Sequence, residues 1–415
     1  MAFREIDVLY DNGQDTPRVG QLASSRTNTV FEYDDAWVKR GIELAPFKLP
    51  TSTRTHTLNP QSTVSSTFGL FADSLPDGWG MLIMDRCFKK RGIDRKDITP
   101  IDRLAFLGNH AMGALCYRPP AQEENVGAIE AVSVGDMARE AYELYEGRIE
   151  DAGRLLALIG GSPGGARPKA LIGISESNDR FVSGVSRLPD GFSHWFVKFS
   201  GESNRYDGVL EFIYNQMAKS AGITVPEHML ITDDKGIRHV ATRRFDRMPG
   251  NRRRHIATAS GLLHADHMAP TLDYEVLLNM AWRLTNSAAQ TEEQFRRAAF
   301  NMFAVNRDDH SKNHGYMMSD EGLWELSPAY DLTYSTGPGG EHWTSYSGEG
   351  RNPCIANLLS VAKSASISNR DALIMVDQVK TSVSTFKRLA KENCVPAKIS
   401  TPIAKHLEAT LTAAA

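Results

Sequence analysis

The sequence predicts an α+β fold that begins with β-strands and ends with helices, and three observations support this fold class. Residues 6–50 hold short runs of β-branched and aromatic residues, separated by turn-forming clusters such as DNGQD. The middle of the chain alternates strand-like and helical runs, and beyond about residue 251 apolar residues recur mainly at helical spacing. A length of 415 residues suffices for two to three domains or for one large two-lobed unit.

The composition is that of an ordinary globular protein, 41% hydrophobic and 23% charged. The net charge of -3 provides no broad basic field, so direct wrapping of DNA is disfavoured. The four cysteines lie far apart without a CxxC pair, which fits a reducing compartment better than a disulfide framework. The first residues form no apolar run, and no later stretch approaches the roughly 18 apolar residues of a spanning helix. We therefore expect a soluble cytoplasmic protein that makes no membrane contact.

A helix is predicted early in the chain, and a subdomain boundary follows it. The segment SLPDGWG places Ser74 and Pro76 at a typical helix start, with apolar residues at helical spacing up to Gly92. Residues 119–132 are polar and contain prolines, as a link between subdomains often does. Beyond this link we expect a helix near 137–158, a Gly-rich loop at 160–169, two strands of which the second contains HWFVKF, and a helix over 207–222.

Long amphipathic segments dominate the remainder of the chain. Each places apolar residues three and four positions apart, which indicates a helix with one buried face. These segments are YEVLLNMAWRLT, EEQFRRAAFNMFAVN, RDALIMVDQVKTSVSTFKRLAKE and the alanine-rich end. We therefore expect this part to be mostly helical.

The densest group of chemically active residues is NRDDHSKN at 306–313. In protein kinases the catalytic base and the metal-binding asparagine are spaced as D-x-x-x-x-N. Asp308 and Asn313 have this spacing, whereas Asp309 is one residue too close. We therefore predict that Asp308 is the base, that Asp309 supports it, and that Lys312 neutralises charge on a transferring phosphoryl group.

Asp331 in SPAYDL stands where a kinase has its second metal-binding aspartate. Two other interpretations of the region remain open. Adjacent aspartates between helices are also typical of a solvated turn that caps a helix. His310 and His314, at positions i and i+4, could share a zinc ion, although no third ligand is evident.

Lys198 in HWFVKF is the candidate for the lysine that contacts ATP phosphates, and Glu211 on the next predicted helix is its candidate partner. A lone lysine in a strand is more often a surface residue, and Glu202 could replace Glu211. The order of Gly-rich loop, strand with lysine and helix with glutamate favours the functional interpretation.

The loop GGSPGGARPK at 160–169 offers backbone amides that could approach phosphates. It contains no Walker motif, and Gly-Pro-rich segments are often plain loops. Arg167 and Lys169 add positive charge, and the Ser162 hydroxyl is placed where a kinase could modify it.

Seven segments, taken in this order, resemble the HipA family of bacterial serine/threonine kinase toxins: FEYDDAW, SLPDGWG, GGSPGGARPKALI, FVKF, RRFDR, NRDDHSKN and SPAYDL. The resemblance implies a two-lobed protein-kinase-like fold with a β-rich N-terminal subdomain and an all-helical C-terminal lobe. The implied units are a HipA-type β-rich subdomain over 1–120, a nucleotide-binding N-lobe with the Gly-rich loop over 121–250, and a helical C-lobe with the catalytic loop over 251–415.

The resemblance also implies ATP and Mg²⁺ as cofactors and a role for each matched residue. Asp308 matches the catalytic aspartate, with Lys312 beside it, and Asn313 and Asp331 match the metal ligands. Ser162 matches a serine that family members autophosphorylate, which ejects the loop and switches the kinase off. The implied nucleotide contacts are Gly164, Gly165, Ala166, Arg167, Pro168, Lys169, Lys198, the hinge residues Arg243, Arg244 and Phe245, and His310, Ser311, Lys312, Asn313, Tyr330 and Asp331.

As partners, the resemblance implies a small helix-turn-helix antitoxin, HipB-like, that makes the main DNA contact, and a protein substrate such as an aminoacyl-tRNA synthetase. The chain departs from the family at Pro163 and Pro168, which remove two amide donors from the loop, and at Arg243, where an acidic residue is more familiar. Two alternatives therefore stay open: a catalytically impaired regulatory subunit of a DNA-bound complex, and a kinase of a small hydroxylated molecule.

Overall fold

The first strands form a five-stranded antiparallel sheet in the computed structural model, which describes residues 5–24, 28–58, 67–119, 130–149, 165, 167–183 and 187–413. The strand order is β4-β3-β2-β1-β5, so the last strand along the chain pairs with the first. Alternate side chains of the first strand are buried, as expected for a sheet with one covered face. The strands are β1 Glu5–Tyr10, β2 Arg18–Ser24, β3 Thr29–Tyr33, β4 His56–Leu58 and β5 Leu115–Arg118.

The helices that accompany this sheet in the described part of the chain are α1 Asp35–Arg40, α2 Gly69–Ala72, α3 Gly78–Lys90 and α4 Pro100–Leu107. The sequence starts α4 unambiguously, because Thr99 and Asp102 form a reciprocal capping box around Pro100 in the first turn. The helix predicted between Ser74 and Gly92 is confirmed as α3.

A second antiparallel sheet has the order β7-β6-β8-β10-β9. In its centre Lys169 of β6 lies directly opposite Lys198 of β8, so their side chains leave the same face of the sheet. The predicted strand with HWFVKF and the helix that follows it are confirmed. The elements are α5 Val134–Tyr145, β6 Lys169–Ser175, β7 Phe181–Ser183, β8 Phe192–Lys198, α7 Asp207–Ser220, β9 His228–Thr232 and β10 Arg238–Arg243.

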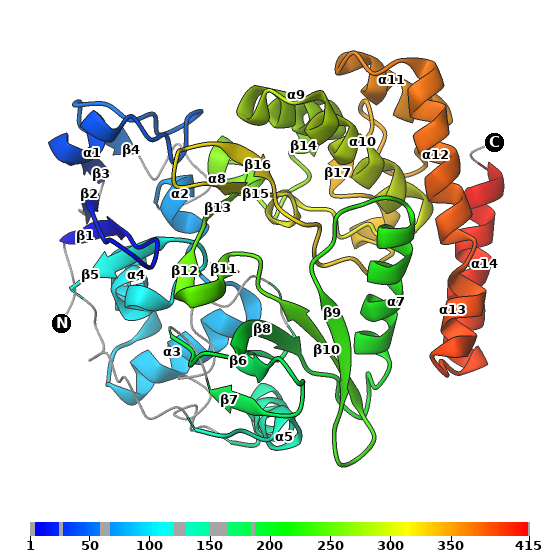
Figure 1. Cartoon of the computed structure of the whole chain (residues 1–415), viewed down its shortest axis with the longest axis horizontal. Coiled ribbons are helices and arrows are strands. Elements are labelled where there is room, and N and C mark those ends of the chain that lie inside the picture. Colours follow the sequence, from blue (N-terminus) through cyan, green and yellow to red (C-terminus); the bar gives the residue numbers. More distant parts are fainter. Residues whose placement is uncertain are drawn as a thin grey trace.

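Helices dominate the rest of the chain, and α9 has the bounds of the predicted segment YEVLLNMAWRLT. They are α8 Ala259–Leu263, α9 Tyr274–Thr285, α10 Ala288–Phe303, α11 Ile355–Ser364, α12 Asn369–Val383, α13 Phe386–Glu392 and α14 Ala397–Ala413. In Figure 1 the first sheet lies at the left, the second below it and the C-terminal helices at the right. The α+β fold class is thus confirmed.

The C-terminal part also contains strands, which the all-helical description leaves out. Strand β14 Leu272–Asp273 pairs with β17 Thr344–Ser345, and β12 Arg252–Arg253 pairs with β11 Arg247–Met248 across the predicted boundary at residue 250. A three-stranded sheet joins β13 His255–Thr258, β15 Gly315–Met318 and β16 Trp324–Leu326. Periodicity could not reveal these strands, because each has only two to four residues.

Among the described residues, two hydrophobic cores hold the elements together, and α3 contributes to both. Trp79 and Ile83 pack with the second sheet and α5, whereas Met84 and Phe88 join the core that unites the first sheet with the C-terminal helices. The division into 1–120, 121–250 and 251–415 therefore remains a proposal, since the larger core contains residues of all three units.

A buried cluster of charges fastens the end of the second sheet to the first. Asp246 accepts hydrogen bonds from Arg244 Nε at 2.9 Å, Arg247 Nη1 at 2.6 Å and the Gly113 amide at 2.9 Å. Burial alone would raise the pKa of Asp246, but the two guanidinium groups outweigh it and hold the pKa well below its usual range. Arg253 extends the cluster to Asp11 at 3.0 Å.

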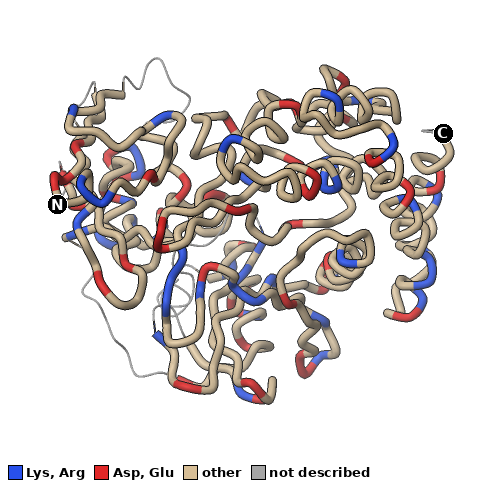
Figure 2. Tube along the Cα trace, turned by 45° about the horizontal axis from the view of Figure 1, so that its top comes forward, with Lys and Arg blue, Asp and Glu red and all other residues tan. Residues whose placement is uncertain are grey.

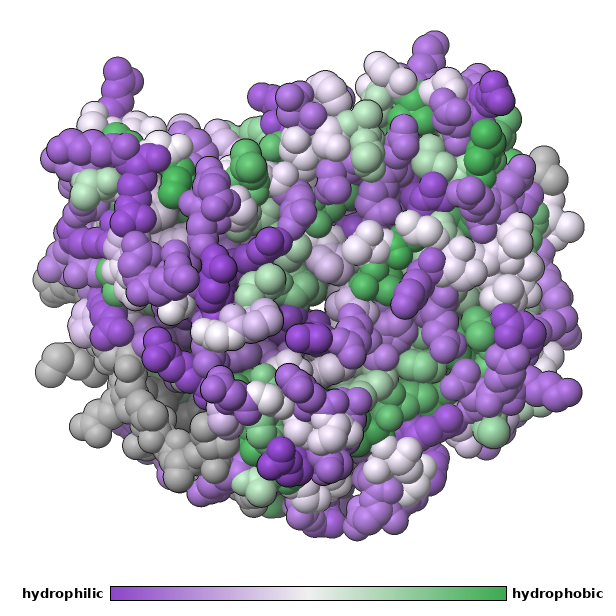
Figure 3. Space-filling model, viewed as in Figure 1, coloured by the Kyte–Doolittle hydropathy of each residue, from purple (hydrophilic) through white to green (hydrophobic). Residues whose placement is uncertain are grey.

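Basic and acidic residues are interspersed along the trace in Figure 2, in agreement with the small net charge. The face in Figure 3 is mainly hydrophilic, with hydrophobic side chains in separate groups. Within the described part of the chain, no helix combines the length and apolar character needed to cross a bilayer.

Asp246→Asn should destabilise the fold by about 3–5 kcal/mol in urea unfolding, because it leaves buried guanidinium groups without their counter-charge. Asp7→Asn is the control. Asp7 pairs with Arg18 at 2.6 Å, and their side chains are 42% and 41% exposed. Loss of this ion pair should therefore lower the free energy of unfolding by less than about 1 kcal/mol.

The pH dependence has a defined sign. Because folding depresses the pKa of Asp246, the advantage of wild type over Asp246→Asn is complete above about pH 4, the ordinary aspartate pKa. It shrinks as the pH falls through the folded pKa. Equal losses in the two variants would contradict the assignment.

Candidate active site

The predicted catalytic loop runs from Asn306 to His314, between α10 and β15. It contains a single helical turn, Ser311–Asn313, and its two aspartates face opposite surroundings. The Asp308 side chain is 49% exposed, whereas that of Asp309 is fully buried. The loop thus presents one carboxylate outward and keeps the other inside.

Asp309 anchors the loop. Its carboxylate accepts hydrogen bonds from Tyr274 Oη at 2.8 Å and from the Trp343 amide at 2.9 Å, and it lies 2.9 Å from His342 Nδ1. Burial raises the pKa of Asp309, but His342 and Tyr274 together outweigh burial, so the carboxyl stays ionised with a lowered pKa. The predicted supporting role therefore has a physical basis in this structure.

Asp308 is held by its backbone rather than by its side chain. Its carbonyl accepts a 2.6 Å hydrogen bond from Asn313 Nδ2, which fixes the relative positions of the two residues that the spacing selected. Its carboxylate lies 3.9 Å from His310 Nε2. Partial burial raises the pKa of Asp308; His310 opposes this, and Asp331 adds to it. A carboxylate in this position can accept a proton from a neighbouring hydroxyl.

Lys198 lies between two carboxylates from distant parts of the chain. Its Nζ is 2.7 Å from Glu211 Oε1 on α7 and also contacts Asp331 Oδ1. Burial would lower the pKa of Lys198, but Asp331 and Glu211 outweigh burial and raise the pKa above its ordinary value, so the ammonium is retained. For Asp331, burial alone would raise the pKa, but Lys198 and Lys169 outweigh burial, so the pKa lies below its ordinary value. The predicted pairing of Lys198 with Glu211, rather than with Glu202, is confirmed.

Both segments that carry acidic site residues contain a strained backbone. Val305, at the entry to the catalytic loop, has φ 51°, and Asp331 has φ 58°. Residues other than glycine rarely adopt these backbone angles. Neighbouring bonds hold these segments: Tyr330 Oη donates to the Lys312 carbonyl at 2.6 Å, and Arg297 Nη2 donates to the Ser327 carbonyl at 2.8 Å. Strain of this kind clusters at functional sites.

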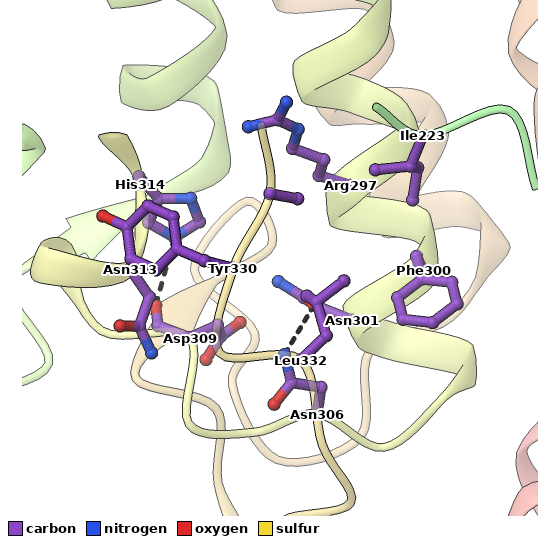
Figure 4. A pocket seen from close by; sticks show the side chains of 11 residues that line it. Ile223, Arg297, Phe300, Asn301, Asn306, Asp309, Asn313, His314, Tyr330 and Leu332 are labelled. Carbon is purple, nitrogen blue, oxygen red and sulfur yellow. Dashed lines mark hydrogen bonds between the residues drawn. The ribbon is translucent and has the colours of Figure 1, made fainter. Parts of the chain in front are cut away.

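A small pocket lies between the catalytic loop, the segment with Tyr330 and α10 (Figure 4). Polar side chains line one part of it, with Asn306 Nδ2 donating to Asn301 Oδ1 at 2.9 Å. Asn301 in turn donates to Tyr274 Oη at 2.9 Å. This polar layer joins the floor of the catalytic loop to α10.

Of the Gly-rich loop, the structure describes Gly165, Arg167, Pro168 and Lys169, whereas Ser162, Pro163, Gly164 and Ala166 lie outside the described residues. Gly165 has φ 106°, a backbone conformation that favours glycine, and a Cβ there would come within 2.7 Å of Nζ at the end of the Lys169 side chain. Arg167 pairs with Asp207 at 3.2 Å.

Lys169 is 2% exposed, and its Nζ lies 5.7 Å from the centre of the Phe196 ring. Burial lowers the pKa of Lys169 to about 8, although Asp331 opposes the shift. Together with Lys198, whose side chain is 13% exposed, it forms a pair of cations on one sheet face, an arrangement suited to an anionic ligand.

The proposed hinge residues point in different directions. Arg243 pairs with Glu227 at 2.9 Å, and the Arg244 side chain is occupied by Asp246. The Arg244 amide donates a hydrogen bond to the His194 carbonyl. Phe245 stacks on Tyr330 with ring centres 5.9 Å apart, which brings those two predicted contacts together.

The structure argues against the zinc interpretation. Both ring nitrogens of His314 have protein partners, Gln294 Nε2 at 3.3 Å and the Asp309 carbonyl at 3.2 Å. Among the described residues, no group of three or more histidine, cysteine and acidic side chains is placed to hold a metal ion.

Sequence reasoning assigned no role to three residues that shape the site. Tyr274 and His342 hold Asp309, and Asp77 Oδ2 lies 3.4 Å from Lys312 Nζ. Their separation along the chain hides these contacts, since Asp77 and Lys312 are 235 positions apart. The only sequence indication was that Asp77 lies within the conspicuous segment SLPDGWG.

The two adjacent aspartates should respond differently to truncation. Asp309→Ala should cost about 3–5 kcal/mol of unfolding free energy, because it leaves buried donors without an acceptor. Asp308→Ala, at a side chain that is 49% exposed, should remain within about 1 kcal/mol of wild type. Urea unfolding followed by circular dichroism measures both, and equal losses would contradict the distinction.

Comparison with known proteins places this chain in a family. Two family models match it, the HipA-like C-terminal domain over residues 161–386 and the HipA N-terminal domain over residues 8–118. The serine/threonine-protein kinase toxin HipA of Shewanella oneidensis is 23% identical over 349 residues, which are 76% of this chain and 72% of that protein. A Sinorhizobium fredii protein named as a kinase is 26% identical over 345 residues, 75% of each.

Among solved structures, a chain of the Shewanella oneidensis complex of HipA, HipB and operator DNA has a TM-score of 0.69 at 17% identity, covering 98% of this chain and 96% of that one. This likeness establishes a shared fold. Because the C-terminal family model alone spans more than half of the sequence, this protein belongs to the HipA family.

Proposed function

We propose that this chain is a serine/threonine protein kinase that depends on ATP and Mg²⁺ and acts as the toxin of a type II toxin–antitoxin system. The observation that carries the proposal is the position of Lys198, buried between Glu211 and Asp331, in a site that also presents the half-exposed carboxylate of Asp308. This set matches the requirements of phosphoryl transfer, which needs a cation for the phosphates, oxygen ligands for magnesium and a base for the attacking hydroxyl.

The side chains present fit a magnesium ion. Asp331 offers carboxylate oxygens. Asn313 offers its amide oxygen, because its Nδ2 group donates a hydrogen bond to the Asp308 carbonyl and thereby fixes the orientation of the amide. Oxygen ligands of this kind suit Mg²⁺, which normally keeps several waters as well. Asn313 and Asp331 would hold the ion, which when bound would supply positive charge that neutralises the phosphates.

The protein groups then divide the remaining work. Lys198 and Lys169 stand on one sheet face to contact phosphate oxygens, and Lys312 lies in the catalytic loop to neutralise charge on the transferring group. Asp308 accepts the proton of the attacking hydroxyl, and its raised pKa brings it closer to the operating pH, as general-base catalysis favours. Phe245 and Tyr330 border the proposed adenine side.

The family relationship supports the biological context that we propose. The relative from Shewanella oneidensis is named as a kinase toxin, and the similar solved structure is a complex with HipB and operator DNA. We therefore propose a small helix-turn-helix antitoxin as partner, DNA contact mainly through that partner, a cytoplasmic location, and a protein substrate such as an aminoacyl-tRNA synthetase. The small net charge of -3 agrees with indirect DNA contact.

Purified protein incubated with labelled ATP and Mg²⁺ should acquire phosphate on Ser162, detected by mass spectrometry. Asp308→Ala should abolish the transfer, a loss of at least about 10³-fold, because the proton acceptor is gone while the fold remains. Ser162→Ala should remove the modification but keep transfer to an added protein substrate. Wild-type activity in Asp308→Ala would refute the assignment of the base.

Lys198→Met should weaken binding of Mg-ATP by at least about 10-fold in calorimetry, because a buried cation beside the phosphates is lost. Lys219→Met is the matched control, since Lys219 lies exposed near the end of α7. Measurable Mg-ATP binding by wild type separates a kinase from a regulatory subunit, which needs none. No binding by wild type would refute the proposed cofactor.

A further inference from the structure

The segment SLPDGWG has no part in the mechanism so far, yet the structure places it against both loops of the candidate site. Asp77 is the N-cap residue of α3, a position where an aspartate usually accepts a hydrogen bond from its own helix. Here the side chain makes no such bond. The carboxylate, 25% exposed, is directed to other partners.

These partners belong to the Gly-rich loop and the catalytic loop. Asp77 Oδ1 accepts a hydrogen bond from the Gly165 amide, and Asp77 Oδ2 lies 3.4 Å from Lys312 Nζ and 4.0 Å from His267 Nε2. Burial alone would raise the pKa of Asp77, but Lys312 and the Gly165 amide outweigh it, so the pKa is lowered and the group stays ionised. One carboxylate therefore touches both loops at once.

Trp79, two residues further on, holds the Gly-rich loop from the same side. Its amide donates to the Gly165 carbonyl at 3.1 Å, and its indole Nε1 donates to the Lys169 carbonyl at 2.9 Å. The ring is 1% exposed and belongs to the core of the second sheet, so its position is fixed. Asp77 and Trp79 thus both bond to Gly165, and Trp79 also bonds to Lys169.

We propose that Asp77 is a positioning residue that couples the Gly-rich loop, at Gly165, to Lys312, so that this loop and the catalytic-loop ammonium are held in a fixed register for one phosphate chain. The proposal rests on the proposed kinase function. It assigns two separable tasks to one side chain: the hydrogen bond to Gly165 sets the loop for nucleotide binding, and the charge beside Lys312 sets the ammonium for the transfer step.

Two substitutions separate these tasks. Asp77→Asn keeps an oxygen that can accept from Gly165 but removes the charge beside Lys312, so kcat should fall by about 10-fold while KM for ATP stays within about 2-fold. Asp77→Ala removes both interactions, so kcat should fall similarly and KM for ATP should rise by roughly 5-fold or more. Asp94→Asn is the control, because Asp94 also caps a helical turn but bonds within it, to the Lys96 amide. It should leave both constants unchanged.

Hydrogen–deuterium exchange provides a readout that does not depend on activity. In nucleotide-free protein, the peptide that contains Gly165 should exchange faster in Asp77→Ala than in wild type, with Asp77→Asn in between and Asp94→Asn unchanged. Thermal unfolding of every variant checks that the fold is retained. If wild type transfers no phosphate, the proposed function fails, and exchange alone then decides the coupling.

Three results would overturn the proposal. Unchanged exchange in Asp77→Ala would show that the carboxylate does not hold the loop. Kinetic constants of Asp77→Asn and Asp77→Ala equal to those of wild type would show that the contacts do not position either group. Faster transfer in Asp77→Asn would mean that the carboxylate restrains Lys312 rather than orienting it.

Discussion

The ion pairs of Lys198 are the interaction on which the arrangement of the site depends. A strand of the second sheet provides the ammonium, α7 provides Glu211, and the segment after β16 provides Asp331. The side chains of Lys198 and Glu211 are only 13% and 6% exposed, so each charge has lost most of its hydration. Such charges are tolerated only when their partners stay in place, which ties three separate elements to one geometry.

This requirement says more about function than about stability. Replacing a buried ion pair by well-packed apolar side chains is often neutral for folding or even stabilising. A second buried lysine, Lys169, lies directly across the sheet from Lys198 and adds like-charge repulsion. The fold therefore maintains charges that packing alone does not require, which is what a site for a highly charged ligand needs. Asp309 is buried and fully bonded whereas Asp308 is half-exposed, so a fixed support lies beside the carboxylate that we propose as the base.

Sequence reasoning found much of this architecture but not its connections. Helix α9 and the pairing of Lys198 with Glu211 follow from local periodicity and from the order of elements, and both were predicted. The strands of the small β13-β15-β16 sheet are too short for periodicity to register. The side chain of Arg244 is engaged by Asp246, because a buried aspartate two positions away competes for its guanidinium. Contacts of Asp309 with Tyr274 and His342 depend on tertiary packing that no local pattern encodes.

The first sheet has a consequence for the order in which the protein can be made. Strand β1 pairs with β2 on one side, but on its other side it pairs with β5, so Val8 must wait for Tyr117 to leave the ribosome. The core that contains Ile6 also contains Leu407 of the last helix. Contacts between residues this far apart in the sequence form late, because bringing them together costs loop-closure entropy. In a nascent chain Lys198 can therefore meet Glu211, which follows 13 positions later, well before Asp331 has been synthesised, and the second carboxylate joins the lysine only late in synthesis.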